Sequence, residues 1–356
     1  MEQRWRRTLL YFLLGVGILI ALTSFVGWEE IAAALWQAKP VFVVLGFVAG
    51  TMQIVMFAFN WYIVLNGIGY DIGLIKTIKV FYAGDFANGI TPLGQMGGEP
   101  IMAYILSKNS SISYEKSFAG IFSADLINSV PFFTYSVIGV TYFILFQSTG
   151  IVVRLLAVTV LLAALFILGF GVLFWYRGEV ALRLLLAARA GFGRVSRFIG
   201  FDDGLFDDLS ADEIRSRYQN FRGTVREVFA RRWMLVESLI VTHAAGLLGF
   251  VGLYAFLLAV GWKAPFFIIM LITPMSVIAF YMPLPGGLGG VELILVSLLI
   301  LLAGVPSGMA SAAVILFRGA VYAVPLVLGA LSLWRISTSW EDVKQAVEEE
   351  ERDIPG

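Results

Sequence analysis

Charged side chains inside apolar stretches are the residues of this sequence that could do chemistry. Glu99 and Glu292 each end the pattern P-x-G-x-x-G-x-E, which occurs twice with a displacement of 193 residues. Asp125 lies 26 residues after Glu99, and Arg318 lies 26 residues after Glu292. Ionisable side chains are costly in lipid and mark pathways for ions or polar groups. These pairs therefore predict a polar path inside a membrane protein.

Further polar and conformationally special residues surround the two patterns. Asp125, Asn128 and Ser129 are spaced at i, i+3 and i+4, so they form one polar stripe on an apolar helix. Asp85 and Asn88, at i and i+3, line the approach to the first pattern. The residues predicted to form the path are Asp85, Asn88, Pro92, Gly97, Gly98, Glu99, Asp125, Asn128, Pro285, Gly286, Gly287, Gly289, Gly290, Glu292 and Arg318.

The partner of each charge is left open by the sequence. Glu292 and Arg318 are at similar depth and could form a partly buried ion pair, whereas a pair between Asp125 and Arg318 is the alternative. If Glu99 lies close to Asp125, one of the two carboxylates would hold a proton near neutral pH, which would permit proton coupling.

Each feature also has a purely structural explanation. Glu99 precedes Pro100, a favoured first helical residue, so Glu99 could be only an N-cap. Glu292 could simply offset a helix dipole, and the glycines could serve close helix packing. His243 is expected to be structural, and with no cysteine and one histidine neither a metal site nor a cofactor is predicted.

The elements that must position these residues are membrane-spanning helices. The chain of 356 residues is 59% hydrophobic and 14% charged, with a mean hydropathy of +0.85, which indicates an all-α polytopic membrane protein. Tryptophans, including Trp61, fall near the predicted span ends, where they would lie at the membrane interface. Windows of spanning length lie at 8–27, 41–65, 117–147, 151–176, 233–260 and 309–334.

Basic residues predict the orientation. The segment 177–232 holds eleven arginines against eight acidic residues, so it is expected in the cytoplasm together with both termini. Within it, Val180 to Phe198 and Ala211 to Ala230 are predicted as amphipathic helices. The predicted organisation is a membrane half at 1–176, a helical linker at 177–232, a second membrane half at 233–336 and a tail at 337–356 of a plasma-membrane protein.

Each predicted span carries the chain from one side of the membrane to the other, so counting the spans gives the side on which each segment lies. This count predicts that the two patterns interrupt re-entrant hairpins. The segment 80–107 must begin and end in the cytoplasm, and 265–303 must begin and end outside. Residues 41–147 and 233–334 would thus form an inverted-topology repeat with two Gly/Pro-broken re-entrant helical hairpins. Two complete crossings within 265–303 would agree equally well with this count of crossings.

Three stretches carry a resemblance to a known family: Asn88-x3-Pro92 to Gly97-Gly98-Glu99-Pro100, then Pro285 to Glu292, then Arg318 to Pro325 and Gly329. Over residues 8–336 the chain is similar to the flippase-like family defined by the transmembrane region of lysylphosphatidylglycerol synthases. The resemblance implies an eight-helix-like membrane domain that moves lipids between leaflets, aminoacylated phosphatidylglycerol in bacterial relatives. Relatives often have Arg where this chain has Met102, and no synthase domain follows before the sequence ends at Gly356.

The function expected from these features is a lipid translocase without enzymatic chemistry. Its partners would be membrane lipids with anionic or glycosylated headgroups, including polyprenyl-linked lipids, and no nucleic acid. A lipid-synthesising enzyme and a second copy of the chain are further candidate partners. The alternatives are a membrane-embedded lipid-modifying transferase and a secondary transporter of a small solute, although no D-x-D pattern or paired histidine supports the transferase.

Overall fold

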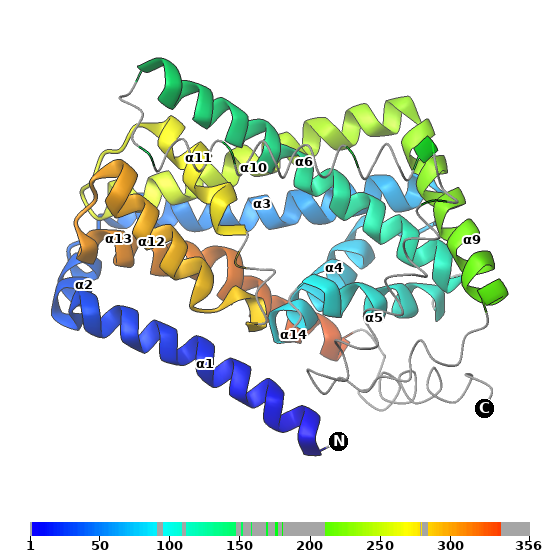
Figure 1. Ribbon diagram of the computed structural model, residues 1–356, viewed down its shortest axis with the longest axis horizontal. Helices are drawn as coiled ribbons and strands as arrows, with labels where there is room; N and C mark the ends of the chain where they lie inside the picture. Colours follow the sequence, from blue (N-terminus) through cyan, green and yellow to red (C-terminus); the bar gives the residue numbers. More distant parts are fainter. Residues whose placement is uncertain are drawn as a thin grey trace.

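A computed structural model describes residues 2–90, 95–108, 112–146, 151, 158, 169, 175–176, 180, 211–277, 279 and 284–335. Within the long stretches of this part, all regular elements are helices (Figure 1). The first six are α1 (Glu2–Val26), α2 (Trp28–Trp36), α3 (Pro40–Gly67), α4 (Leu74–Ile90), α5 (Gln95–Lys108) and α6 (Tyr114–Phe146). They are followed by α9 (Ala211–Ala230), α10 (Arg232–Ala259), α11 (Phe266–Ser276), η3 (Pro285–Gly287), α12 (Gly290–Ala303), α13 (Ser307–Arg318), η4 (Gly319–Ala323) and α14 (Val324–Arg335).

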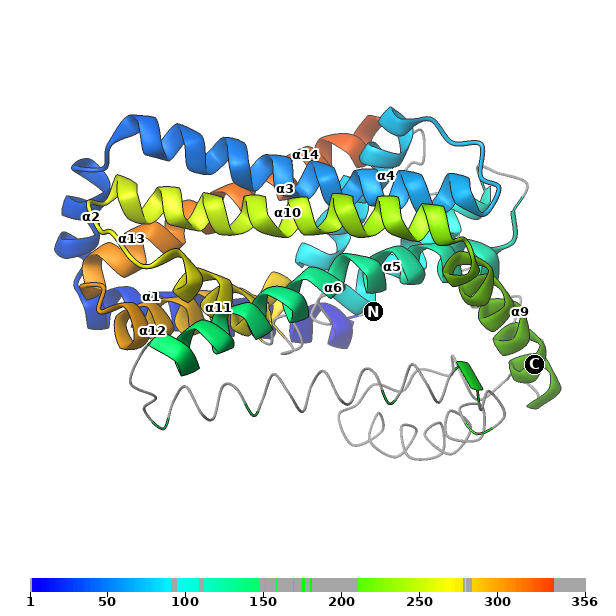
Figure 2. The ribbon, with the colours of Figure 1, turned by 90° about the horizontal axis from the view of Figure 1, so that it is seen from above.

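Helices α3 and α10 form the central antiparallel pair (Figure 2). At one end the Lys39 N–H donates to the Ala259 carbonyl at 2.9 Å, and at the other end Gly67 lies against the side chain of Met234. Between these ends small residues allow the two backbones to approach, because a Cβ at Gly252 would meet backbone atoms of Gly50 at 3.4 Å. Such close approach through small residues is typical of helix packing in membranes.

Four shorter helices lie at opposite ends of this pair. Helices α4 and α5 contact each other at the end that α9 occupies, whereas α11 and α12 contact each other at the end that α2 occupies (Figures 1 and 2). Helix α4 packs against α14, with Gly329 directly over the Tyr82 carbonyl. Helix α11 packs against α6, where Gly139 lies against the backbone of Leu271.

Two hydrophobic clusters stabilise the two ends separately. The larger cluster joins α10, α11, α12 and α13 towards the α2 end, and the smaller one joins α3, α5 and α6 towards the α9 end. Along α6 the smaller cluster includes Ile127, and the larger cluster begins with Val140. Asn128 follows Ile127 directly, so the polar stripe of α6 lies where the smaller cluster ends.

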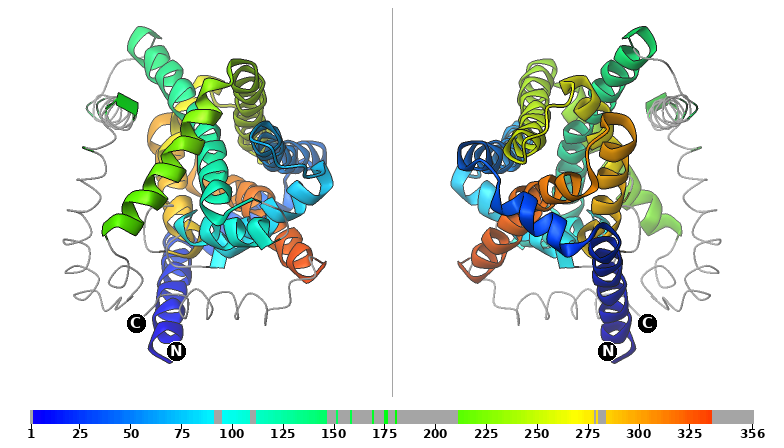
Figure 3. Two further views of the ribbon diagram at one scale, coloured as in Figure 1. Left: turned by 90° about the vertical axis from the view of Figure 1, so that its right-hand side faces the viewer. Right: turned by 90° about the vertical axis from the view of Figure 1, so that its left-hand side faces the viewer.

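Helix α1 lies at the periphery of the bundle when the molecule is seen end-on (Figure 3). The axis turns by 84° between α1 and α2. Gly27 stands at this bend with φ of 96°, a conformation that glycine adopts without the Cβ clash of other residues. The predicted span 8–27 is therefore the first arm of a bent helix pair.

The structure agrees with most of the predicted helices. The predicted windows 41–65, 117–147, 233–260 and 309–334 all fall on long helices. By length and composition the described residues contain five helices able to cross a membrane, or six if the bent pair is one span, which confirms a helical multi-span membrane protein. The predicted helix at 211–230 matches α9, while the window 151–176 and the predicted helix at 180–198 lie largely outside the described residues.

The interfacial position predicted for Trp61 is wrong. Its side chain is only 2% exposed, and the indole N–H donates to the Asp125 carboxylate at 2.7 Å. A polar partner inside the protein replaces the lipid headgroup region as the environment of the indole N–H. Trp233 and Trp334, by contrast, are more than 80% exposed near helix ends.

Candidate functional site

The second glycine-rich break has a backbone that only glycine adopts readily. Pro285 begins the short turn η3, and Gly286, Gly287 and Gly289 have φ of 56°, 66° and 81°. Gly290 is then the first residue of α12. A Cβ on Gly289 would also lie 2.7 Å from the Gly15 carbonyl of α1, so the break packs directly against the first helix.

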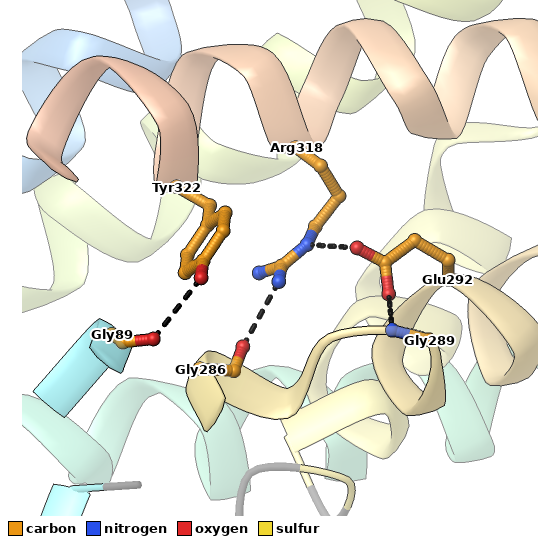
Figure 4. A network of polar contacts seen from close by, with 6 residues as sticks. All are labelled: Gly89, Gly286, Gly289, Glu292, Arg318 and Tyr322. Atoms are coloured by element: carbon orange, nitrogen blue, oxygen red, sulfur yellow. Dashed lines mark hydrogen bonds and ion pairs between the residues drawn. The ribbon is translucent and has the colours of Figure 1, made fainter. Parts of the chain in front are cut away.

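A buried ion pair joins this break to α13. The Nε of Arg318 donates to Oε1 of Glu292 at 2.6 Å, and both residues are 5% exposed (Figure 4). The other carboxylate oxygen of Glu292 accepts the backbone N–H of Gly289 at 2.7 Å. Glu292 therefore caps α12 and pairs with Arg318 at the same time, so the two explanations offered by the sequence are both correct.

Arg318 continues the network across the break. Its second guanidinium nitrogen donates to the Gly286 carbonyl at 2.9 Å, and the guanidinium carbon lies 4.3 Å from the centre of the Tyr322 ring. The Tyr322 hydroxyl donates to the Gly89 carbonyl near the end of α4 at 3.1 Å (Figure 4). Residues of the first and second breaks are thus linked through one arginine and one tyrosine.

Tyr322 lies in an irregular turn of its own helix. Residues Gly319–Ala323 form the π-helical segment η4 directly after Arg318. Such π segments are rare in proteins overall, but those that occur are often found at functional sites. They turn the following side chains relative to a regular α-helix. Here the segment follows Arg318, which contacts the second break, and contains Tyr322, which contacts Gly89 near the first break.

The first break is only partly described. Pro92 lies outside the described residues, and Gly97 is the third residue of α5. The Gly98 N–H donates to the Asn88 side-chain oxygen at 2.6 Å, which ties α5 to α4. A Cβ on Gly98 would lie 2.7 Å from the Gly84 carbonyl, so the packing explanation holds for this glycine.

The proposed N-cap role of Glu99 is wrong. Helix α5 begins at Gln95, so Glu99 is its fifth residue and Pro100 lies inside the helix. The Asn88 side chain supplies an acceptor for a backbone N–H near this helix start, so no cap by Glu99 is needed. Glu99 is half-buried.

Three half-buried carboxylates interact electrostatically with one another, and one of them interacts with Arg318 of the ion pair. Asp125 interacts electrostatically with Asp85 and with Glu99, and Asp85 interacts with Arg318. Asp125 accepts hydrogen bonds from Trp61 at 2.7 Å and from Asn128 at 3.3 Å. Within the described residues, Asp85 and Glu99 make no side-chain hydrogen bond, so both could receive a polar ligand.

The predicted polar stripe on α6 is only partly directed at this cluster. The Asn60 side-chain amide donates to the Asn128 side chain and to the Ala124 carbonyl, each at 3.0 Å. Ser129 instead donates back to the Leu126 carbonyl of its own helix. Asn128 thus positions Asp125 through hydrogen bonds, and Ser129 does not.

Several residues of the site were missed from the sequence. Asn60 and Trp61 on α3 support Asp125, and Tyr322 connects the two breaks. An asparagine inside an apolar span is a signal that could have found Asn60. Tyr322 has no such signal, because its role depends on the π-helical turn and on the distant Gly89.

His243 is held by contacts within the protein. One ring nitrogen of His243 lies 2.7 Å from the Leu239 carbonyl, and the ring packs at an angle against Tyr135, as expected of a structural histidine. Across the described residues, no group of three or more His, Asp or Glu side chains is placed to hold a metal ion.

Comparisons with known proteins agree with the membrane architecture. Residues 9–329 match the family described as "Lysylphosphatidylglycerol synthase TM region". Two UPF0104 membrane proteins of Methanothermobacter thermautotrophicus are each 26% identical; one alignment covers 86% of this chain and 88% of that relative, and the other 92% and 93%. A UPF0104 membrane protein of Pyrococcus horikoshii is 22% identical over 90% of this chain and 95% of its own. Because the family match extends over most of its length, the chain belongs to the family of the lysylphosphatidylglycerol synthase transmembrane region.

Proposed function

We propose that the two membrane halves are inverted repeats and that the protein moves lipids between leaflets. The element lengths support the repeat, since α3 and α10 have 28 residues each and α5 and α12 have 14 residues each. The contacts are reciprocal, because α4 packs on α14 while its counterpart α11 packs on α6. An antiparallel α3–α10 pair at the centre is the arrangement that a two-fold axis in the membrane plane requires.

The short arms α5 and α11 support re-entrant hairpins, while the 19 residues Pro285–Ala303 are long and apolar enough to cross a membrane. At 1.5 Å per residue, α11 rises about 16 Å and α5 about 21 Å, whereas a hydrocarbon core is about 30 Å thick. Each broken segment would therefore dip into the membrane and return to its own side. The α9 end would be cytoplasmic, because α9 and its flanking segments carry the excess of arginine.

One observation carries the proposed function: the charged side chains of both broken hairpins meet in a single cluster. Arg318, Glu292 and Tyr322 link the second break to the end of α4, next to Asp85, Glu99 and Asp125. Charges are expensive inside a membrane and are retained where polar groups must pass. In this protein the polar group would be a lipid headgroup, as the family membership supports, while the acyl or prenyl chains remain in the bilayer.

Two half-buried carboxylates, Asp85 and Glu99, make no side-chain hydrogen bond to any described residue and would contact the headgroup or exchange protons with it. The ion pair of Glu292 and Arg318 would hold the second break in shape. We infer no enzymatic chemistry for this site; a lipid-synthesising enzyme would supply the transported lipid, and the protein would act in the plasma membrane.

A headgroup-exposure assay tests this function. The full chain is reconstituted in vesicles that contain a trace of phosphatidylglycerol with a fluorescent acyl chain, and a membrane-impermeant reductant destroys the label in the outer leaflet. We expect movement from the inner leaflet with the native protein and roughly tenfold slower movement with Glu99→Gln, which removes a charge of the path without changing shape. Glu292→Gln is expected to abolish movement.

Glu227→Gln is the matched control, because Glu227 is 39% exposed on α9 and pairs only with Arg231 within the described residues. Lipid movement at the native rate is expected for this variant. A modified lipid appearing on chromatography without movement would instead support a transferase. Movement that is equally fast in empty vesicles would reject the proposed function.

A further inference from the structure

The groove between α4 and α14 carries two positive charges that form no ion pair with any other described residue. It has a volume of about 360 Å³ and is lined by Lys79 of α4 and by Arg335 at the end of α14. Among the described residues, neither side chain forms an ion pair or a hydrogen bond. Two unpaired cations that face one hollow create a local excess of positive charge, which attracts an anion.

A buried hydroxyl group in the same groove also lacks a partner. Tyr82 lines the groove and is only 4% exposed, and its hydroxyl makes no hydrogen bond within the described part of the chain. Buried hydroxyl groups are normally satisfied, since an unsatisfied one costs free energy. The hydroxyl oxygen itself has almost no accessible surface, so a ligand with acceptor oxygens in the groove would contact Lys79 and Arg335 but not this hydroxyl group.

The rim of the groove is apolar and exposed. Ile75 is 71% exposed and Leu331 is 50% exposed, and both line the groove. In a membrane these side chains face lipid chains, so the ligand combines an anionic head with apolar tails. Ser332 adds a hydroxyl group between the two kinds of surface.

The corresponding groove at the opposite end has no charged residue among the described residues that line it. Between α6 and α11 a groove of about 490 Å³ is lined by Tyr142, Thr141 and Phe267, among other apolar residues. In the proposed repeat this groove is the counterpart of the α4–α14 groove, because α6 corresponds to the helix that ends in α14 and α11 corresponds to α4. Tyr142 and Arg335 are separated by the same 193 residues as the two glycine-rich patterns.

The groove also leads towards the central charged cluster. Asp85 follows Tyr82 by one helical turn on α4, and Asp85 interacts electrostatically with Arg318. Lys79 and Asp85 are six residues apart, so about 9 Å of helix separates the groove from the cluster. A phosphate bound by Lys79 would therefore lie close to the start of the polar path.

We propose that the α4–α14 groove binds the phosphate of an anionic phospholipid from the leaflet at the α9 end, and that its uncharged counterpart does not. Lys79 and Arg335 contact the phosphate oxygens, and the acyl chains lie along Ile75 and Leu331. The inference deepens the proposed function, since this groove would load the lipid, but binding can be measured without translocation.

Native mass spectrometry of the full chain in detergent tests the groove, with dioleoylphosphatidylglycerol as the probe and dioleoylglycerol for comparison. We expect phosphatidylglycerol to bind and dioleoylglycerol to bind at least tenfold more weakly. Lys79→Gln and Arg335→Gln should each weaken phosphatidylglycerol binding about fivefold, and the double variant about 25-fold.

Thr141→Val and Tyr142→Phe in the counterpart groove are the matched controls and should leave phosphatidylglycerol binding unchanged. Unchanged binding in the Lys79/Arg335 double variant would overturn the proposal. Full competition by millimolar inorganic phosphate would also overturn it, because the site would then recognise a free anion. If binding depends on these residues but no lipid moves in vesicles, the result would support lipid binding in the groove and reject the proposed translocase function.

Discussion

At the scale of single residues, the ion pair of Glu292 and Arg318 is the contact whose loss should destabilise the protein strongly. Both side chains are buried, and each also bonds to the backbone of the second break. Removing one member of a buried pair leaves the other charge uncompensated, whereas removing both avoids this cost. The pair should therefore behave as a unit.

We predict that Glu292→Gln lowers the free energy of unfolding by about 3–5 kcal/mol. The double variant Glu292→Gln/Arg318→Gln should lose much less than the sum of the single variants. Unfolding in mixed detergent micelles measures these changes. Glu227→Gln, which removes the exposed ion pair with Arg231 on α9, should cost less than about 1 kcal/mol; additive single and double effects at positions 292 and 318 would show that the two charges do not interact.

Gly286 provides a second residue-scale prediction. Its φ of 56° is unfavourable for other residues, and an added Cβ would collide with the Tyr322 ring. Gly286→Ala should lower stability by about 2 kcal/mol or more and slow lipid movement. Gly69 has a φ of 94°, and nothing lies within 4 Å of a Cβ added there. The variant Gly69→Ala should therefore lose only the stability that the unfavourable backbone conformation costs. Equal melting temperatures of the two variants would contradict a contact with Tyr322.

At the scale of elements, one side chain holds α5 against α4. The Asn88 oxygen accepts the Gly98 N–H, and the glycine brings the two helices close together. The hairpin around the first break therefore depends on a local hydrogen bond as well as on apolar packing. The second hairpin is held by an ion pair instead, so the two hairpins differ in how strongly they are fixed.

We predict that Asn88→Ala increases hydrogen exchange of residues 95–108 about fivefold to tenfold, because about 1–1.5 kcal/mol of hydrogen bonding is lost. Asn88→Asp keeps an acceptor oxygen and should restore most of the protection. Asn66→Ala is the control, since Asn66 bonds to Ile72 in the turn between α3 and α4. Its effect should remain in that turn, and equal exchange of 95–108 in all three variants would refute the role of Asn88.

At the scale of the whole molecule, the proposed orientation places the α9 end in the cytoplasm. The chain has no cysteine, so a single introduced cysteine can be labelled without background. Ser216 is exposed on α9, and Lys263 is exposed in the turn before α11 at the opposite end. The two positions should therefore face different aqueous compartments.

We predict that Lys263→Cys is labelled by a membrane-impermeant maleimide in intact cells and that Ser216→Cys is labelled only after permeabilisation. Ser113→Cys, between α5 and α6, should behave like Ser216→Cys, because both hairpin arms of the first break return to the same side. The reverse pattern would invert the assigned orientation, and labelling of Ser113→Cys from outside would exclude the first re-entrant hairpin.

The sequence by itself determined the class of the protein, most of its long helices and the charged residues of the site. Apolar length and charge cost are local properties, so the spans near α3, α6, α10 and α13–α14 and a buried ion pair of Glu292 and Arg318 as one of two candidates could be predicted from composition and spacing. Helix α9 could be predicted for the same reason, since its polar and apolar residues alternate with helical period.

Only the tertiary structure decided which charges meet. The choice between Glu292 and Asp125 as the partner of Arg318 depended on how the broken segments fold back, and spacing along the chain was equal for both hairpins. The start of α5, the burial of Trp61 and the link from Tyr322 to Gly89 likewise depend on contacts between distant segments. Side-chain partners across a bundle are set by packing of helices that are far apart in the sequence, and no local pattern encodes them.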